Sequence, residues 1–407
     1  MPQISKKQEK IVLFVLGTMI ALGPFSIDMY LPGFDYIADE FSVKKADVGL
    51  SLTSYFIGIA LGQLVYGPLM DKFGRKKPLL IGLLIYFLAA LSCAYSPNLM
   101  WLVVSRFFLA MGASAGMVAA RAVVRDVFPP EEVARAISFL MLIMGGAPII
   151  APTVGSMVIA HFSWHIIFVV LALFCFVIFI SVSSFLPESI VPDKTVELKL
   201  TKITKKYYEI MTDKVFMTFS LAGGFTIGAL FSYITFAPTL FLDEFNLTET
   251  QFGWFFGLNA AGLIAGSQMN RVVLKRNTTF YVTKVISVLL VLVGALLLLN
   301  TFSFNNFYIT LVLLFTILFL LGFQNPNTTA LSLFPFTQRA GRASALVGSL
   351  KMGVGAMVSF IISSFFTDSV LFMSFVIFIC LLISGLLIFR FQTKYKDTCD
   401  SLILTDK

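Results

Sequence analysis

Long apolar runs separated by short polar connectors fill most of the 407 residues of the chain. A helix needs about twenty mostly apolar residues to cross a bilayer. Runs of that length predict twelve membrane-spanning helices, at residues 11–34, 48–69, 78–96, 98–120, 134–159, 163–186, 214–241, 250–270, 280–300, 307–331, 342–366 and 369–390. The pattern therefore predicts an all-α membrane protein.

One long polar segment inside the chain, residues 187–213, divides the predicted helices six and six. We expect an N-terminal six-helix bundle at 1–186, a central cytoplasmic loop at 187–213, a C-terminal six-helix bundle at 214–390 and a cytoplasmic tail at 391–407. Two motifs recur in corresponding helices of the halves, Gly58-x-x-x-Gly62 as Gly262-x-x-x-Gly266 and Arg135-Ala136-Ile137-Ser138 as Arg342-Ala343-Ser344. Such a parallel repeat is typical of secondary transporters.

Composition and charge agree with a membrane protein. Hydrophobic residues make up 58% of the chain and charged residues 13%, whereas a soluble protein carries about a quarter charged residues. The net charge of +8 does not indicate nucleic-acid binding, because the basic residues gather in the connectors of one side. Only Lys44 and Lys45 fall in the opposite connectors, and Arg106 and Lys351 lie within predicted helices. The positive-inside rule therefore predicts a multi-pass protein of the cell inner membrane with both termini cytoplasmic.

Other sequence signals exclude several classes of protein. The first apolar run follows a basic leader but is long and lacks a small-residue cleavage site, so we interpret it as a retained signal-anchor. The cysteines have neither disulfide-framework nor metal-ligand spacing, and His161 and His165 flank Trp164 in a short loop, where we interpret them as interfacial. No phosphate-binding glycine loop or Ser/His/Asp constellation occurs. We therefore expect no metal, no cofactor and no enzymatic activity.

The connector between the second and third predicted helices carries a specific motif, Gly67-Pro68-Leu69-Met70-Asp71-Lys72-Phe73-Gly74-Arg75-Lys76-Lys77. Gly67 permits close approach of helices, and Asp71 could accept hydrogen bonds from a neighbouring helix N-terminus. Arg75 supplies a guanidinium fork for a carboxylate partner such as Asp126. The basic residues alone indicate only an orientation signal, but the spacing closely resembles the signature loop of the major facilitator superfamily, which latches the two halves on the cytoplasmic side.

Four further segments narrow the resemblance. They are Ile27-Asp28-Met29-Tyr30-Leu31-Pro32, the fourth helix from Arg106 through Ala120-Arg121-Ala122-Val123-Val124-Arg125-Asp126, Ala147-Pro148-Ile149-Ile150-Ala151-Pro152-Thr153-Val154-Gly155, and Gly341-Arg342-Ala343-Ser344-Ala345-Leu346. Together they look like the bicyclomycin-resistance and chloramphenicol-exporter (Bcr/CflA) group of drug:proton antiporters, over nearly the whole chain. The sequence departs from the group at Leu109, where glutamine is usual, at Lys351 and at Ala147.

The resemblance implies a fold and a set of roles. The fold is that of the major facilitator superfamily, with twelve transmembrane helices in two pseudo-symmetric six-helix bundles and no cofactor beyond the proton gradient. The cytoplasmic latch comprises Gly67, Asp71, Gly74, Arg75, Arg121, Arg125 and Asp126. Arg106 matches the motif that the family ties to proton exchange, and Pro148, Pro152 and Gly155 match the antiporter motif of helix five. The expected partners are protons, a small-molecule substrate and the lipid bilayer, with the chain a monomer.

Three ionisable residues lie within the predicted spans: Asp28, Arg106 and Lys351. Such residues are costly in a bilayer and usually face a cavity or a partner. Asp28 and Arg106 both lie roughly 6–10 Å inside the outer boundary, which makes them a candidate pair for proton coupling. Our hypothesis is that Asp28 carries the proton. The alternative is a permanent ion pair that fixes helix one against helix four.

Lys351 lies about 13 Å along its helix from Arg342, near the midplane. Three roles are open for it: contact with an anionic or carbonyl-bearing substrate, neutralisation of Asp28 in one conformation, or snorkelling to the inner headgroups.

Polar and flexible side chains on the helices expected to line a cavity complete the predicted substrate site. Besides Asp28 and Lys351, these are Tyr30, Met141, Met144, Tyr233, Asn259, Gln324, Asn325 and Asn327. Pro326 lies among three amides and frees a backbone carbonyl, which predicts a broken or kinked tenth helix. Hydrogen bonding between helices is the alternative role for each amide.

The favoured function is proton-coupled export of small amphipathic drugs or toxic compounds by alternating access. A transporter of one physiological metabolite, working as an exporter or a proton symporter, shares every motif and remains the alternative. A membrane-embedded enzyme predicts a cluster of His, Asp or Glu at a membrane face, and the sequence has none. A receptor would more naturally carry a large soluble domain.

Overall fold

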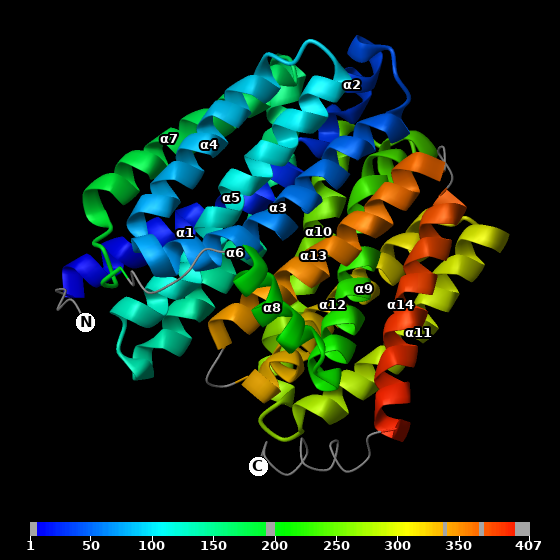
Figure 1. Ribbon diagram of the computed structural model, residues 1–407. Helices are drawn as coiled ribbons and strands as arrows, with labels where there is room; N and C mark the ends of the chain where they lie inside the picture. The colour runs from blue at the N-terminus through cyan, green and yellow to red at the C-terminus, as the bar shows by residue number, and fades with distance from the viewer. Residues whose placement is uncertain (1–5, 193–199, 337–339, 366–369, 395–407) are drawn as a thin grey trace. The chain divides into compact units, whose positions relative to one another are not determined.

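The computed structural model describes residues 6–192, 200–336, 340–365 and 370–394 (Figure 1). The described residues form helices and no strand, in two compact units, Met1–Lys205 and Lys206–Lys407. The first unit contains α1 (Lys6–Asp28), the 3₁₀ turn η1 (Leu31–Gly33), α2 (Phe34–Phe41), α3 (Lys45–Phe73), α4 (Lys76–Ala94), α5 (Leu99–Val127), α6 (Pro130–His161) and α7 (His165–Phe185). The boundary between the units falls within α8 (Leu200–Met211).

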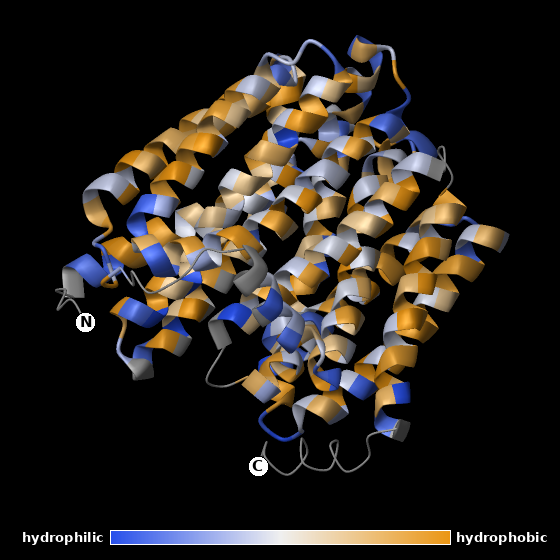
Figure 2. Ribbon diagram, viewed as in Figure 1, coloured by the Kyte–Doolittle hydropathy of each residue, from blue (hydrophilic) through white to orange (hydrophobic). Residues whose placement is uncertain are grey.

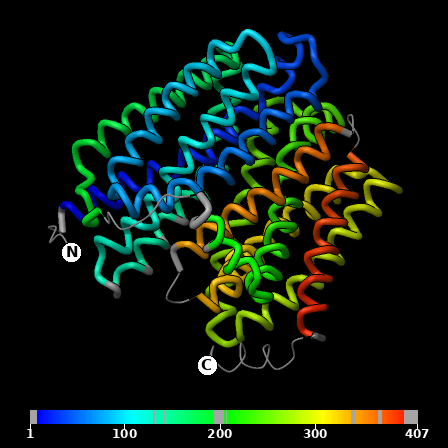
Figure 3. The backbone as a smooth tube through the Cα atoms, viewed as in Figure 1, coloured from blue at the N-terminus to red at the C-terminus, as the bar shows by residue number. Residues whose placement is uncertain are grey.

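The second unit contains α9 (Lys214–Pro238), the π-helical turn η2 (Thr239–Glu244), α10 (Glu249–Val273), α11 (Thr279–Ser303), α12 (Phe307–Leu333), the 3₁₀ turn η3 (Phe334–Phe336), α13 (Ala340–Phe365) and α14 (Val370–Lys394). The trace in Figure 3 follows the long helices of each unit as they run back and forth through it.

The long helices have the length and polarity of membrane spans. Within the described residues, eleven segments are long and apolar enough to cross a membrane. The twelfth long helix, α10, has 25 residues but is more polar, because it carries Asn259, Gln268 and Asn270. In Figure 2, hydrophobic residues cover most of the helical length and hydrophilic residues gather toward the helix ends. The predicted all-α membrane architecture with twelve long helices is confirmed.

In the first unit α5 is the central helix. It packs against α1, α3 and α4, while α4 and α1 also pack against α7. Glycines allow the closest approaches: a Cβ added at Gly112 of α5 would lie 2.6 Å from the backbone nitrogen of Tyr86 in α4. Gly58 and Gly62 of α3 lie against α5 in the same way, at Phe107 and Ser114. Without side chains on the glycines, the backbones come into direct contact.

In the second unit α9 packs against α12, α13 and α14, and α12 packs against α10 and α11. Gly262 and Gly266 of α10 lie against Phe315 and Phe319 of α12. The recurring glycine motif of the sequence therefore has the same role in each unit, where it packs the second long helix against the fourth.

The first predicted helix ends earlier than expected. It was predicted to continue to residue 34, but α1 ends at Asp28 and is followed by η1 and α2. The cause is Pro32, which has no backbone N–H to donate to the carbonyl of Asp28, four residues earlier. Asp28 is therefore the last residue of a helix instead of an interior one.

Two other expectations also differ from the structure. The predicted central loop contains a helix, α8, of 12 residues. Of the predicted broken or kinked tenth helix, the break is wrong, because α12 continues through Pro326, and the kink stays a prediction. The hydroxyls of Thr328 and Thr329 donate to the carbonyls of Gln324 and Asn325 at 2.9 and 2.8 Å. These side-chain hydrogen bonds add donors near Pro326, which has no backbone N–H to donate within the helix.

Replacing Gly58 by alanine is expected to destabilise the protein by roughly 1–3 kcal/mol. The added Cβ would lie 2.5 Å from the carbonyl oxygen of Phe107 and 2.8 Å from Cβ of Ala110, so α3 and α5 must separate. Gly146→Ala is the matched control, since no neighbouring atom lies within 4 Å of its Cβ position, and it should be neutral or stabilising by up to about 1 kcal/mol. The melting temperature in detergent checks both, and an unchanged value for Gly58→Ala would contradict the packing.

Candidate functional site

The end of α1 places a buried carboxyl group in the first unit. Asp28 is 3% exposed, and within the described residues it forms no hydrogen bond or ion pair. The next residue, Met29, lies against Gly155 of α6, where an added Cβ would be 2.9 Å from the Met29 carbonyl carbon. The antiporter-like motif predicted in the fifth helix thus contacts the backbone directly after Asp28. Its Pro148 and Pro152 lie within the continuous helix α6.

Arg106 of α5 lies in an aromatic cage. Its side chain is fully buried, and its guanidinium carbon lies 4.5 Å from the ring centre of Tyr30, 4.7 Å from that of Tyr55 and 5.8 Å from that of Phe168. Such stacking stabilises a cation through the electron density of the rings. Nη1 donates a 2.6 Å hydrogen bond to the carbonyl of Ser26. Because α1 ends two residues later, this carbonyl belongs to the electronegative C-terminal end of the helix, which a cation caps favourably.

The permanent ion pair between Asp28 and Arg106, the alternative to a proton-carrying role of Asp28, is absent from the described residues. Instead, Nε and Nη2 of Arg106 have no hydrogen-bond partner there. These two nitrogens form one edge of the guanidinium, the edge that can bind a carboxylate through two parallel bonds. Arg106 binds the carbonyl of Ser26, two residues before Asp28, so an unpaired acid and an unpaired guanidinium edge both lie at the end of α1.

Hydroxyl groups hold the cage in place. The Tyr30 hydroxyl pairs with the Ser51 hydroxyl at 2.5 Å, and the Tyr86 hydroxyl pairs with the Ser26 hydroxyl at 2.6 Å. The Tyr55 hydroxyl donates to the carbonyl of Gly23 at 3.2 Å. These bonds join the end of α1 to α3 and α4, which fixes the rings around the guanidinium.

Lys351 occupies a polar site in the second unit. It is 5% exposed, and its Nζ donates to the carbonyl of Asn325 at 3.0 Å, to Oγ1 of Thr328 at 2.9 Å and to Oγ1 of Thr329 at 2.7 Å. Gly223 of α9 closes the site, since an added Cβ would lie 2.6 Å from Nζ. The ammonium group is therefore held inside the unit by α12 and does not extend toward the end of α13.

The predicted amides of the second unit bridge helices. Asn259 Nδ2 donates to the Tyr233 hydroxyl at 2.9 Å, which joins α10 to α9. Gln324 Nε2 donates to Ser287 Oγ at 2.8 Å, which joins α12 to α11, and Asn327 and Asn270 exchange two bonds of 3.1 and 2.8 Å between α12 and α10. The carbonyl oxygens of Asn259 and Gln324 lack a partner among the described residues.

The two predicted methionines lie in α6. Met144 is half-buried, and the side chain of Met141 lies outside the described residues.

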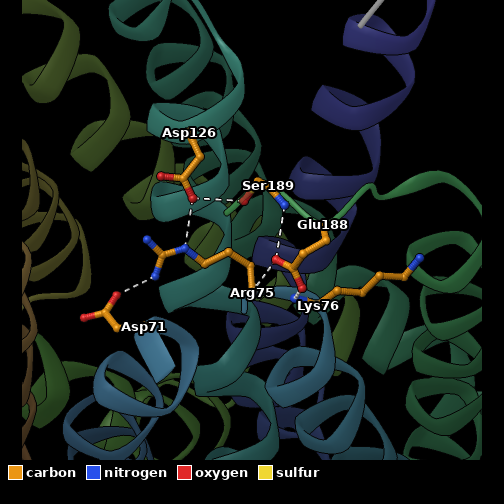
Figure 4. Close-up of polar contacts among 6 residues, drawn as sticks. All are labelled: Asp71, Arg75, Lys76, Asp126, Glu188 and Ser189. Atoms are coloured by element: carbon orange, nitrogen blue, oxygen red, sulfur yellow. Dashed lines mark hydrogen bonds and ion pairs between the residues drawn. The ribbon is translucent and has the colours of Figure 1, made fainter. Parts of the chain in front are cut away.

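The α3–α4 connection forms a polar cluster of Asp71, Arg75, Asp126, Glu188 and Ser189 (Figure 4). Arg75 donates from Nη1 to Asp71 at 2.8 Å and from Nε to Asp126 at 2.9 Å, and Ser189 Oγ donates to Asp126 at 2.9 Å. Burial lowers the pKa of Arg75, but the hydrogen bonds and charges of Asp126 and Asp71 bring it above its ordinary value. The guanidinium therefore stays charged and joins the ends of α3 and α5.

Glu188, just after α7, supplies the anion at the N-terminus of α4. Its carboxylate accepts from the backbone N–H of Arg75 at 2.6 Å and of Lys76 at 3.1 Å. Helix N-termini favour such an anion. The sequence analysis gave this role to Asp71, whose carboxylate instead accepts from Arg75. Gly74 adopts φ of 85°, a region that favours glycine, and an added Cβ would lie 2.7 Å from Cδ of Glu188.

The other predicted latch residues lie outside this cluster. Gly67 is half-buried in α3, Arg125 is exposed, and Arg121 is half-buried with Nε lacking a hydrogen-bond partner among the described residues. No group of three or more His, Cys, Asp or Glu side chains that could hold a metal lies within the part of the chain that the structure describes.

Sequence reasoning missed the partners of the predicted residues. Glu188 and Ser189 lie in the predicted loop 187–213 and were assigned no role, although Glu188, 113 residues from Arg75, accepts a hydrogen bond from its backbone N–H. The rings of Tyr55 and Phe168 and the hydroxyls of Thr328 and Thr329 were also missed. Tyrosine, phenylalanine and threonine are common in membrane helices, so their place in the sequence does not single these residues out. Only their contact with a buried cation in the folded structure identifies them.

Known proteins resemble this chain in sequence and in fold. The model of the Major Facilitator Superfamily matches residues 15–359. The transporter YdgK of Bacillus subtilis is 34% identical over 87% of this chain and 88% of its own length. The bicyclomycin resistance protein homolog of Haemophilus influenzae is 30% identical over 94% of this chain and 96% of its own. A bacterial homolog of the human lysosomal transporter Spinster has a similar structure, with a TM-score of 0.75 and 12% identity over 97% of this chain and 99% of that chain.

Replacing Glu188 by alanine is expected to lower stability by roughly 0.5–2 kcal/mol, as loss of a helix cap does. The N–H groups of Arg75 and Lys76 would lose their acceptor. Glu188→Gln keeps one acceptor oxygen and should lose less, and Asp39→Ala, at an exposed position of α2, is the control. Thermal unfolding in detergent ranks the three variants. Equal melting temperatures for Glu188→Ala and Asp39→Ala would argue against the cap.

Proposed function

This chain belongs to the major facilitator superfamily, in its Bcr/CflA group, and from that premise we propose that it exports small amphipathic compounds in exchange for protons. The family and its structural neighbours are transporters and not enzymes. In our proposal the chain works by alternating access as a monomer and needs no cofactor. One charge that crosses 100 mV supplies about 2.3 kcal/mol.

The proposal is carried by two observations at the end of α1: Asp28 is buried without a hydrogen bond or ion pair among the described residues, and Nε and Nη2 of Arg106, which binds the Ser26 carbonyl through Nη1, have no partner there. An ionised carboxylate is costly to bury without a partner, whereas the protonated acid is far less so. The C-terminal end of α1 is also the negative end of the helix dipole, which disfavours an anion there. A buried Asp28 without a partner therefore suits the protonated form.

Loss of the proton changes which partner Asp28 needs. The carboxyl group gives up H⁺ and becomes a carboxylate, and the Nε and Nη2 groups of Arg106 offer it two donors. The proton and the guanidinium thus compete for one acid. A cationic or polar substrate that reaches Asp28 favours release of the proton, which couples export of the substrate to entry of a proton.

Substrate contacts are proposed on both units. In the first unit they are Asp28, Tyr30, Met141 and Met144. In the second unit they are Tyr233, Asn259, Gln324, Asn325, Asn327 and Lys351. The unpaired carbonyl oxygens of Asn259 and Gln324 support this set, because each is an acceptor that a substrate N–H or O–H can use.

Replacing Asp28 by asparagine is expected to reduce uptake driven by an imposed pH gradient at least about tenfold, the equivalent of 1.4 kcal/mol. Asparagine keeps the size of the side chain but cannot bind or release a proton. The measurement uses proteoliposomes and a panel of cationic, neutral and anionic drugs, with Asp39→Asn as the control. Full pH-driven transport by Asp28→Asn would disprove the coupling role, and transport of one metabolite alone would favour the alternative function.

Both termini are expected on the cytoplasmic side, because the basic connectors lie there. Green fluorescent protein fused after Lys407 should fluoresce, and alkaline phosphatase fused at that point should be inactive. Alkaline phosphatase fused at Ser96, between α4 and α5, should be active. Activity of the C-terminal phosphatase fusion would reverse the proposed orientation.

A further inference from the structure

The three hydrogen-bond partners of Lys351 can accommodate an ammonium group. Thr328 Oγ1 lies 2.9 Å from the carbonyl of Gln324, and Thr329 Oγ1 lies 2.8 Å from that of Asn325, so each hydroxyl can donate its one proton to α12. Both hydroxyl oxygens then accept from Nζ, and the Asn325 carbonyl can only accept. Nζ therefore donates three protons in this arrangement, and only the ammonium form has three.

None of the described helices of the second unit that pack around Lys351 carries an acid that could compensate this ammonium group. Aspartate and glutamate are absent from α13 and from α9 and α12, the helices of the second unit that pack against it. The other titratable or charged residues on these helices are Lys214, Tyr233, Tyr308 and Arg342. Each lies at least about 13 Å along its helix from the nearest residue at the site. Lys351 is thus a buried cation satisfied by neutral acceptors alone.

The same site can also hold the neutral amine. An amine has two protons and one lone pair. If the Thr328 hydroxyl turns from the Gln324 carbonyl toward Nζ, it donates to the lone pair, and the amine donates its two protons to Asn325 and Thr329. No heavy atom needs to move, because Nζ and Oγ1 are already 2.9 Å apart. Both protonation states are therefore fully hydrogen-bonded.

A substrate that contacts Lys351, as proposed above, must displace one of these hydrogen bonds, whereas exchange of a proton need not. All three N–H groups of the ammonium are used within the protein, and Gly223 leaves no space on the side of α9. Thr329, one of the three partners of Nζ, is only half-buried, so the site is not fully enclosed within the unit.

We propose that Lys351 is a second proton-exchanging group of the exporter, with the Thr328 hydroxyl stabilising both its ammonium and its amine forms. In the exchange R–NH₃⁺ gives R–NH₂ and H⁺, and the proton passes to water. This inference rests on the proposed function, since a second proton matters for export only if protons drive it. Lys351 would then exchange its proton in the second unit as Asp28 does in the first.

The direct test is proton titration of the purified protein in unbuffered detergent solution. A coupling group must exchange its proton near the working pH, so Lys351→Met should release about one proton fewer than the unmodified protein across the neutral range. Lys284→Met, in α11, is the matched control and should release the same number of protons as the unmodified protein. Equal proton release from Lys351→Met and the unmodified protein would overturn the proposal. This titration needs no transport, so it is independent of the proposed function.

The second test is the pH profile of substrate exchange in proteoliposomes without a pH gradient. Thr328→Val removes the hydroxyl but keeps the shape of the side chain, and the charged form should lose more because its hydrogen bonds are stronger. The midpoint of the profile should move to lower pH in Thr328→Val and stay unchanged in Thr328→Ser. A purely structural role of Thr328 would lower the rate equally at every pH. Superimposable profiles after scaling would therefore contradict the proposal, even if Lys351→Met failed to fold.

Discussion

The C-terminal end of α1 and the guanidinium of Arg106 depend on each other, and the site in the first unit depends on both. Pro32 ends the helical hydrogen bonding at Asp28. The last backbone carbonyls of α1 therefore lack helical N–H donors inside the unit. Arg106 caps one of them at Ser26, and three aromatic rings surround its charge. A permanent cation can stay buried here because a helix end and aromatic rings replace water.

Both units hold a buried cation that forms no ion pair with a carboxylate among the described residues. In the first unit Arg106 uses a carbonyl and aromatic rings, and in the second Lys351 uses a carbonyl and two hydroxyls. Neutral acceptors stabilise a buried cation without holding a carboxylate in a permanent ion pair with it. A carboxylate can then bind to and leave the Arg106 site, and a proton can bind to and leave the Lys351 site, as the proposed proton-coupled transport requires.

Much of the fold could be predicted from the sequence, because lipid imposes a simple rule. Backbone groups in a bilayer must bond within their own segment, so apolar runs of sufficient length become helices. The outcome of the prediction depended on single residues that change the local backbone hydrogen bonding of a helix. Pro32 ended α1 early, whereas Pro326 left α12 continuous. A single proline allows either outcome, and the side chains packed around it decide between them.

The sequence by itself determined the twelve long helices, the two-part repeat and the ionisable residues worth attention, since hydropathy and charge are properties of each residue alone. The tertiary structure decided the partners of those residues. It put Glu188 instead of Asp71 at the N-terminus of α4, left Asp28 and Arg106 without an ion pair, and gave Lys351 three acceptors on α12. Hydrogen bonds extend only about 3 Å, so they depend on the rotation and depth of each helix, which packing fixes and hydropathy does not encode.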